Sequence, residues 1–214
     1  MQFFLGTTNP YKVREIGSIL IERAHSLTPV DVVDPEETGS TFEENSALKA
    51  RAYAAHTGGL TISEDSGLVI PVLGGYPGVW SARFADYKHL FHGLGPGRYG
   101  LHVPSHRSRE EMDKANCERV LQLMDGIRNR KAIFKVVLTV ALPNGDIQFQ
   151  ATGESHGMIA EGMRGTDGFG YDPIFIGDDT FGHTYAELDS ARKNLRSHRR
   201  QVLEKFAAFL DQAL

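Results

Sequence analysis

The chain has little of several features that would define a class of protein at once. Its 214 residues contain one cysteine, Cys117, so no disulfide can form within the chain, which fits a reducing compartment. No apolar run approaches the ~20 residues of a membrane-spanning helix. The first residues, MQFFLG, lack the length and the basic flank of a signal peptide. We therefore expect a soluble cytoplasmic protein.

An excess of basic charge is also missing. The 23 Lys and Arg residues are outnumbered by 27 Asp and Glu residues, and the formal net charge is −4. No overall positive field exists to hold nucleic acid non-specifically, so any phosphate site must be built from local cations. The sequence predicts neither a nucleic-acid partner nor a membrane partner.

Apolar segments that alternate with turn residues predict an α/β fold. We expect strands at residues 3–5, 30–33, 60–62, 133–142 and 147–152, and helices around 13–20, 42–56, 109–124 and 197–214. The segment PNGD at 143–146 predicts a hairpin, which makes the sheet mixed. Capping boxes are expected at Thr41 and Ser108. Residues 86–108 lack periodicity, which predicts a long surface loop.

The most informative segment is LTISEDSGL at residues 60–68, where Glu64 and Asp65 follow a short apolar strand and precede an expected Ser-Gly turn. Two carboxylates held close together are costly unless they share a cation or a proton. The pattern indicates either a hard metal ion, with Mg²⁺ the best candidate and with chemistry on phosphate or water, or a solvated acidic turn. Taken alone, the segment favours neither.

Two other segments suit a nucleotide. TTNPYK at 7–12 precedes a helix, where free N–H groups favour an anion and Lys12 adds positive charge, although an ordinary helix cap has the same pattern. In GTDGFGYDPIF at 165–175, glycines flank Phe169 and leave its ring open for stacking on a base, and Pro173 holds Asp172 extended. A glycine-rich turn around a core aromatic is the alternative.

Positive residues also gather at the expected start of the last helix. Lys193, His198 and Arg199 oppose the helix dipole there, which indicates a ligand. Glu44, by contrast, is explained as the third residue of a capping box. Cys117 falls on the apolar face of a helix, which indicates packing rather than a nucleophile.

Taken in order, these segments resemble the inosine triphosphate pyrophosphatase family of house-cleaning nucleotide hydrolases. The matching pieces span nearly the whole chain and are TTNPYK (7–12), TFEEN (41–45), DSGL (65–68), GYPGVWSAR (75–83), GFGYDPIF (168–175), TYAEL (184–188) and SHR (197–199). The resemblance implies one domain of residues 1–214 with two lobes, a long mixed twisted sheet flanked by helices, and an active-site cleft between the lobes. It also implies a homodimer.

The resemblance further implies Mg²⁺-dependent hydrolysis of inosine and xanthosine triphosphates and their deoxy forms to the monophosphate and pyrophosphate, which clears them from the nucleotide pool. Asp65 would orient or deprotonate water and, with Glu44 and Glu64, bind Mg²⁺. The family usually has aspartate where this chain has Glu64. The residues that would bind the nucleoside triphosphate are Thr7, Thr8, Asn9, Lys12, Ser66, Phe169, Gly170, Tyr171, Asp172, Lys193, His198 and Arg199.

Two alternatives stay open. One is a nucleotide-sensing protein on the same scaffold without hydrolysis, for which Glu64 and the 86–108 segment are the support. The other is a related pyrophosphatase of modified pyrimidines, which residues 168–175 and 197–199 favour less. The sequence does not rank inosine against xanthosine or ribose against deoxyribose.

Overall fold

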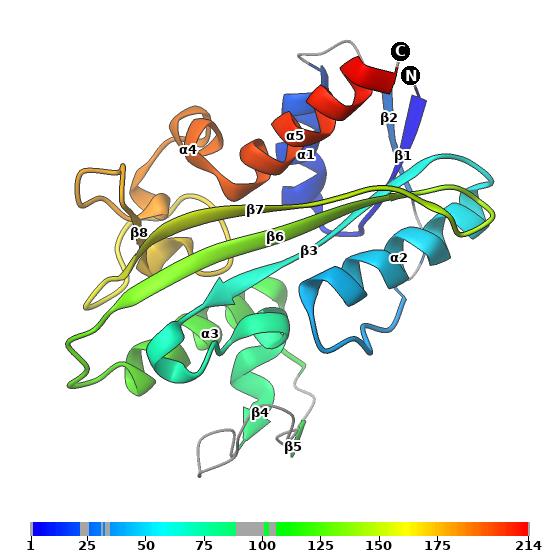
Figure 1. The fold of residues 1–214 in the computed structure, drawn as a ribbon. Coiled ribbons are helices and arrows are strands. Elements are labelled where there is room, and N and C mark those ends of the chain that lie inside the picture. Colours follow the sequence, from blue (N-terminus) through cyan, green and yellow to red (C-terminus); the bar gives the residue numbers. More distant parts are fainter. Residues whose placement is uncertain are drawn as a thin grey trace. The chain divides into compact units, whose positions relative to one another are not determined.

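The computed structural model describes residues 2–21, 26–30, 32, 35–88, 101–102 and 106–213. It confirms the α/β class, because six strands form one mixed sheet in the order β2-β1-β3-β6-β7-β8 with helices against it (Figure 1). These strands are β1 (Gln2–Gly6), β2 (Ser26–Pro29), β3 (Thr61–Val69), β6 (Lys131–Ala141), β7 (Ile147–Ile159) and β8 (Phe175–Gly177). The α-helices are α1 (Pro10–Ile21), α2 (Phe42–Thr57), α3 (Arg109–Leu123), α4 (Ser190–Arg196) and α5 (His198–Ala213).

The chain divides into two compact units, each assembled from separate segments. The first unit contains Met1–Ser66, Lys135–Glu154 and Asn194–Leu214, and the second contains Gly67–Phe134 and Ser155–Lys193. Each unit has its own hydrophobic core. The candidate site residues are therefore described unit by unit.

In the first unit, α1 and α5 pack together on one face of the sheet and α2 lies on the other (Figure 1). The second half of strand β6 is buried on both of its faces. Val136, Leu138 and Val140 belong to the core that α1 and α5 complete. Thr139 faces α2, where its hydroxyl bonds with that of Ser46 at 2.7 Å. This alternation is the period of two that a strand imposes.

The second unit is built around α3 and a core of aromatic and aliphatic side chains. The rings of Phe134 and Phe175 lie 4.3 Å apart between centroids, and Tyr185 packs against both. Cys117 and Val120 of α3 are buried in the same core, as the helical spacing predicts. A two-stranded sheet of β4 (Tyr87–Lys88) and β5 (Leu101–His102) also belongs to this unit.

Most of the strongly periodic elements lie where the sequence predicts them, including the three long helices α2, α3 and α5. The hairpin at 143–146 is confirmed, since the Gly145 N–H donates to the Leu142 carbonyl and the Leu142 N–H to the Asp146 carbonyl, both at 2.9 Å. The capping box at Ser108 is complete, with both reciprocal bonds to Glu111. At Thr41 the side chain accepts from the Glu44 N–H at 3.1 Å, whereas the Glu44 carboxylate bonds to Ser40 instead.

The strand expected at 30–33 is wrong, because β2 lies at Ser26–Pro29 and pairs in parallel with β1. This strand is at the edge of the sheet and its side chains are mostly exposed, so it has no alternating apolar pattern. A proline ends it, as an edge strand tolerates. Residues 31, 33 and 34 lie outside the described residues.

The Ser-Gly turn expected after Asp65 is also wrong, because β3 continues to Val69. Gly67 is needed for a different reason. A Cβ at Gly67 would lie 2.3 Å from the Ser81 hydroxyl and 2.6 Å from the Gly78 carbonyl. The glycine therefore marks a close backbone approach within a strand rather than a turn.

The loop expected at 86–108 needs correction at its two ends. Asp86 ends a 3-10 helix (Gly78–Asp86), β4 and β5 pair with each other, and Arg107 bonds to the Asp86 carboxylate at 2.8 Å. The remaining residues of the segment's interior, 89–100 and 103–105, lie outside the described part of the chain.

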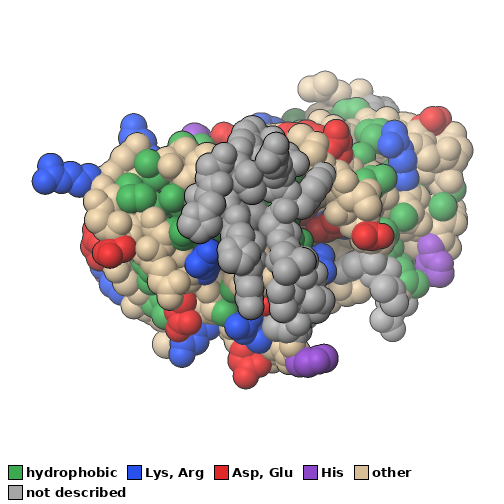
Figure 2. All heavy atoms as spheres, turned by 90° about the horizontal axis from the view of Figure 1, so that it is seen from below, with side chains coloured by type: hydrophobic (Ala, Val, Ile, Leu, Met, Phe, Trp, Pro, Cys, Tyr) green, Lys and Arg blue, Asp and Glu red, His purple; other side chains and the backbone are tan. Residues whose placement is uncertain are grey.

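The charge distribution agrees with the composition. On the face drawn in Figure 2, acidic and basic side chains are intermixed rather than gathered into one basic patch. Within the described ranges, no helix has the length and apolarity needed to cross a membrane.

Replacement of Phe206 by alanine should destabilise the protein strongly. The Phe206 ring lies 5.4 Å from Phe3 and 5.2 Å from Phe149 between centroids, and truncation of such a ring leaves a cavity that costs about 3–5 kcal/mol. Urea unfolding measures the loss. The control is Phe181→Ala, since Phe181 is 93% exposed and should change stability by less than about 0.5 kcal/mol. Equal shifts for both variants would contradict this description of the core.

Candidate active site

In the first unit, the parallel pairing of β1 and β3 brings two candidate segments together. Gly6, the last residue of β1, is in register with Ser63, so the loop that follows β1 begins beside Glu64. Within this loop, the Asn9 side chain accepts from the Tyr11 N–H at 3.0 Å, and the Thr7 hydroxyl accepts from the Asn9 N–H at 3.2 Å. These bonds hold the loop at the start of α1.

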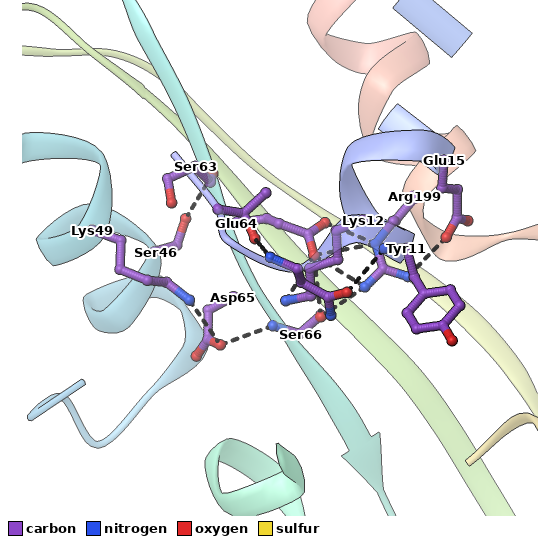
Figure 3. A network of polar contacts seen from close by, with 12 residues as sticks. Tyr11, Lys12, Glu15, Ser46, Lys49, Ser63, Glu64, Asp65, Ser66 and Arg199 are labelled. Atoms are coloured by element: carbon purple, nitrogen blue, oxygen red, sulfur yellow. Dashed lines mark hydrogen bonds and ion pairs between the residues drawn. The ribbon is translucent and has the colours of Figure 1, made fainter. Parts of the chain in front are cut away.

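Glu64 is almost fully buried and is held by two cations (Figure 3). The Arg199 guanidinium donates to both carboxylate oxygens, at 2.9 to 3.1 Å, and the Lys12 ammonium lies 3.0 Å from one of them. Burial acts to raise the pKa of Glu64, but Arg199 and Lys12 outweigh it and hold the pKa well below its usual range. Glu64 is therefore ionised and fully engaged.

Arg199 lies between carboxylates from two other elements. Its Nη1 is 3.1 Å from Glu15 on α1, and its Nη2 also donates to the Ser66 hydroxyl at 2.9 Å. Figure 3 shows Glu15 and Glu64 approaching the guanidinium from different directions. Burial lowers the pKa of Lys12 against the opposing charge of Glu64. The network is thus a buried group of charges from α1, β3 and α5.

Asp65, one residue further along β3, has a different environment. Its Oδ1 accepts from the Ser66 N–H at 3.0 Å and lies 3.5 Å from the Lys49 ammonium. Its Oδ2 is buried and has no hydrogen-bond partner among the described residues. Burial raises the pKa of Asp65, with Lys49 opposing the shift and Glu37 adding to it. Of the two adjacent acids, Asp65 is the one with an oxygen left available.

Glu37 is one of the residues that the sequence interpretation missed. It pairs with Lys49, which also contacts Asp65, so the ammonium joins the two carboxylates. A signal was present, because Glu37 is the second of two acids directly before a Thr-Gly pair, much as Asp65 precedes Ser-Gly. Its role depends on a spatial approach that the sequence alone does not give.

Glu44 lies at the surface, and its carboxylate is hydrogen-bonded to a nearby residue of the same loop and helix start, Ser40. Its Oε2 accepts from the Ser40 N–H at 2.7 Å and from the Ser40 hydroxyl at 2.9 Å, and these bonds lower its pKa. Within the described residues, no group of three or more His, Cys, Asp or Glu side chains is arranged to hold a metal. The assignment of Glu44 and Glu64 as metal ligands stays a prediction.

The second unit gathers the other candidate residues around Asp172. The Asp172 Oδ2 accepts from the Phe169 N–H at 2.7 Å and from the Lys193 ammonium at 2.6 Å. Lys193 also lies over the Phe169 ring, 4.5 Å from its centroid. A Cβ at Gly168 would be 2.1 Å from the Asp172 carboxylate, so this turn needs glycine there. Phe169, Asp172 and Lys193 form one connected group.

Two candidate residues have side chains directed into the protein. The Tyr171 hydroxyl donates to the Ser81 carbonyl at 2.8 Å inside the second unit's core, and burial raises its pKa. His198 is buried at the start of α5 in the first unit. Gly153 permits this packing, since a Cβ there would be 2.1 Å from the His198 carbonyl oxygen.

Thr7 and Thr8 line a pocket of about 490 Å³ in the first unit. Its other lining residues are Pro10, Val13, Arg14, Pro29 and Val30. Arg14 is thus a positively charged residue beside the segment 7–12, which is expected to bind phosphate. The sequence interpretation did not include Arg14.

Comparison with known proteins identifies the family. The model of the Ham1 family matches residues 3–209. The dITP/XTP pyrophosphatase of Bacillus licheniformis is 37% identical over 99% of this chain and 99% of its own length, and that of Bacillus subtilis is 40% identical over 97% and 96%. The solved Ham1 protein of Staphylococcus aureus is 31% identical with a TM-score of 0.78, and the match covers 100% of both chains. The chain belongs to the Ham1 family, and the resemblance drawn from its motifs is confirmed.

Replacement of Arg199 by alanine should cost about 3–5 kcal/mol of folding stability, because it leaves Glu64 and Glu15 buried without their shared cation. Arg200→Ala is the matched control. Arg200 pairs with Glu204 one helical turn away at the surface, and such pairs contribute about 1 kcal/mol or less. Denaturant unfolding measures the free energy of unfolding of both variants. A loss for Arg199→Ala as small as that for Arg200→Ala would show that the buried network does not stabilise the fold.

Proposed function

We propose that this chain hydrolyses non-standard purine nucleoside triphosphates, namely ITP, dITP and XTP, to the monophosphate and pyrophosphate. The observation that carries the proposal is the buried Asp65 carboxylate, with one oxygen lacking a hydrogen-bond partner in the described structure, beside Lys12 and Lys49. The names of the curated relatives, dITP/XTP pyrophosphatases, support the same reaction. Its role in the cell would be to clear these nucleotides from the pool.

Mg²⁺ fits the residues present. Mg²⁺ binds oxygen ligands and is commonly held by one or two carboxylates together with substrate phosphates. Asp65 and Glu37 would hold it, because both carboxylates contact Lys49 and Asp65 keeps a buried oxygen available. Glu44 is placed second because its Oε2 already accepts from the Ser40 N–H and hydroxyl. Bound Mg²⁺ would neutralise charge on the phosphates.

The first unit would bind the triphosphate and activate water. Asp65, whose buried Oδ2 has no hydrogen-bond partner among the described residues, would orient water and accept its proton during attack on the α-phosphorus. Lys12 and the N-terminus of α1 would stabilise the negative charge of the departing pyrophosphate. The other proposed contacts to the phosphates come from Thr7, Thr8, Asn9, Ser66 and Arg199.

The second unit would recognise the base. Phe169 supplies a ring for stacking, and Lys193 is a donor beside that ring. A donor aimed at the 6-oxo group of a deaminated purine would face an amino group in adenine. Leaving a buried donor unpaired costs about 1–3 kcal/mol, which favours the deaminated base. Gly170, Tyr171 and Asp172 are the other proposed contacts of this unit, and His198 of the first unit is also proposed to contact the nucleotide.

The domain of residues 1–214 is further proposed to act as a homodimer in the cytoplasm. The resemblance to the family supports the homodimer, and the single cysteine supports a reducing compartment such as the cytoplasm.

A substrate panel tests the activity. Purified protein with Mg²⁺ should release pyrophosphate from ITP, dITP and XTP, with kcat/KM at least about 5-fold above that for ATP, as one unpaired donor predicts. The same panel without Mg²⁺ is the control. Absence of pyrophosphate from every nucleotide would refute the proposal, and tight ITP binding without turnover would favour a nucleotide sensor instead.

A carboxylate series tests the assigned roles. Asp65→Asn should lower kcat by about 100-fold or more, because the amide cannot accept the proton from water. Glu37→Gln should raise the Mg²⁺ concentration needed for half-maximal activity, whereas Glu44→Gln should leave it nearly unchanged. Circular dichroism checks that each variant is folded. A larger effect at Glu44 than at Glu37 would restore Glu44 as the ligand.

A further inference from the structure

The turn that carries Phe169 is held by two side chains of α3 that have no part in the proposed reaction. The Gly170 N–H donates to the Asp113 Oδ2 at 2.8 Å, and the Cys117 Sγ donates to the Gly170 carbonyl at 3.3 Å. Asp113 and Cys117 are four residues apart and so lie on the same face of α3. Both polar backbone groups of Gly170 are thus bonded to side chains of one helix.

The neighbouring amide is fixed in a similar way. The Phe169 N–H donates to Asp172, so two consecutive N–H groups bond to two different carboxylates. The Phe169 N–H lies in the peptide plane before the Phe169 Cα and the Gly170 N–H in the plane after it, so these bonds fix both planes. The two planes together determine the direction in which the Phe169 side chain leaves the backbone.

The turn would be loose without such bonds. Gly168 has a φ of 79° and Gly170 a φ of 62°, both in the left-handed region that glycine adopts freely. A glycine on each side of Phe169 gives the backbone many alternative conformations. Asp113 and Asp172 restrict that freedom from two sides.

Keeping the Asp113 carboxylate ionised costs free energy because the side chain is partly buried. Burial raises its pKa, the Gly170 N–H opposes the shift, and the charge of Asp172 adds to it. A hydrogen bond to an ionised acceptor is roughly twice as strong as one between neutral groups. The free energy lost by burying the Asp113 carboxylate is therefore offset in part by a strong hydrogen bond to the Gly170 N–H.

We propose that Asp113 is a positioning residue for base recognition, which through Gly170 holds the Phe169 ring where the base stacks. Cys117 assists by donating to the carbonyl of the same residue, Gly170. The proposal rests on the proposed function of Phe169. A ring held in place before binding reduces the entropy lost when the base docks. The effect should fall on KM more than on kcat, because the groups proposed for water activation belong to other segments.

Three variants test the role. Asp113→Ala should raise the KM for ITP by about 10-fold and change kcat by less than about 3-fold, as loss of one charge-assisted bond predicts. Asp113→Asn keeps an acceptor for the Gly170 N–H and should recover most of the affinity. Lys114→Ala is the control, since Lys114 is the next residue on α3 and is exposed. An unchanged KM, or a fall in kcat alone, overturns the proposal.

Hydrogen exchange gives a readout that does not depend on activity. The amides of residues 168–172 should exchange faster in Asp113→Ala than in the wild type, and Lys114→Ala should match the wild type. Unchanged exchange in Asp113→Ala overturns the proposal.

The two proposals can fail separately. If the wild type releases no pyrophosphate, the proposed function fails, and calorimetric titration with ITP then decides the role of Asp113. Weaker binding by Asp113→Ala supports the positioning role. Equal binding by both proteins, or no binding by the wild type, overturns it.

Discussion

The first unit depends on the compensation of charge around Arg199. A buried charge without a partner costs several kcal/mol, and here the guanidinium meets Glu64 and Glu15 while Lys12 shares Glu64. These residues come from α1, β3 and α5, which are far apart in the sequence. Burial of each charge is offset only when its partners are in place, so the ion pairs hold α1, β3 and α5 in fixed positions relative to one another.

Because Arg199 and Lys12 satisfy Glu64, the two adjacent acids of β3 are chemically different. Glu64 serves to hold cations in place, and Asp65 keeps an oxygen without a hydrogen-bond partner in the described part of the chain. A strand directs successive side chains to opposite faces, and this geometry separates the two environments. A carboxylate held in a buried charge network and one with an oxygen left available can therefore be neighbours in sequence.

Sequence reasoning predicts the elements whose patterns are strong and local. The helices α2, α3 and α5 and the hairpin at 143–146 have clear periodicity or turn chemistry. Strand β2 is misplaced by such reasoning because an exposed edge strand has no alternating apolar pattern. Gly67 is misinterpreted because its need for space arises from Ser81, which only the fold brings near. Glu37 is missed for the same reason, since Lys49 links it to Asp65 across the fold.

The first unit is assembled from segments that are far apart in the sequence, which affects when it can fold during synthesis. This unit needs Asn194–Leu214, the last segment of the chain, to complete its core. During synthesis the chain emerges from its N-terminus, so Glu15 and Glu64 leave the ribosome long before Arg199. The first unit therefore cannot mature until α5 has been synthesised, and a chain that stops before Arg199 lacks the cation that its buried acids require.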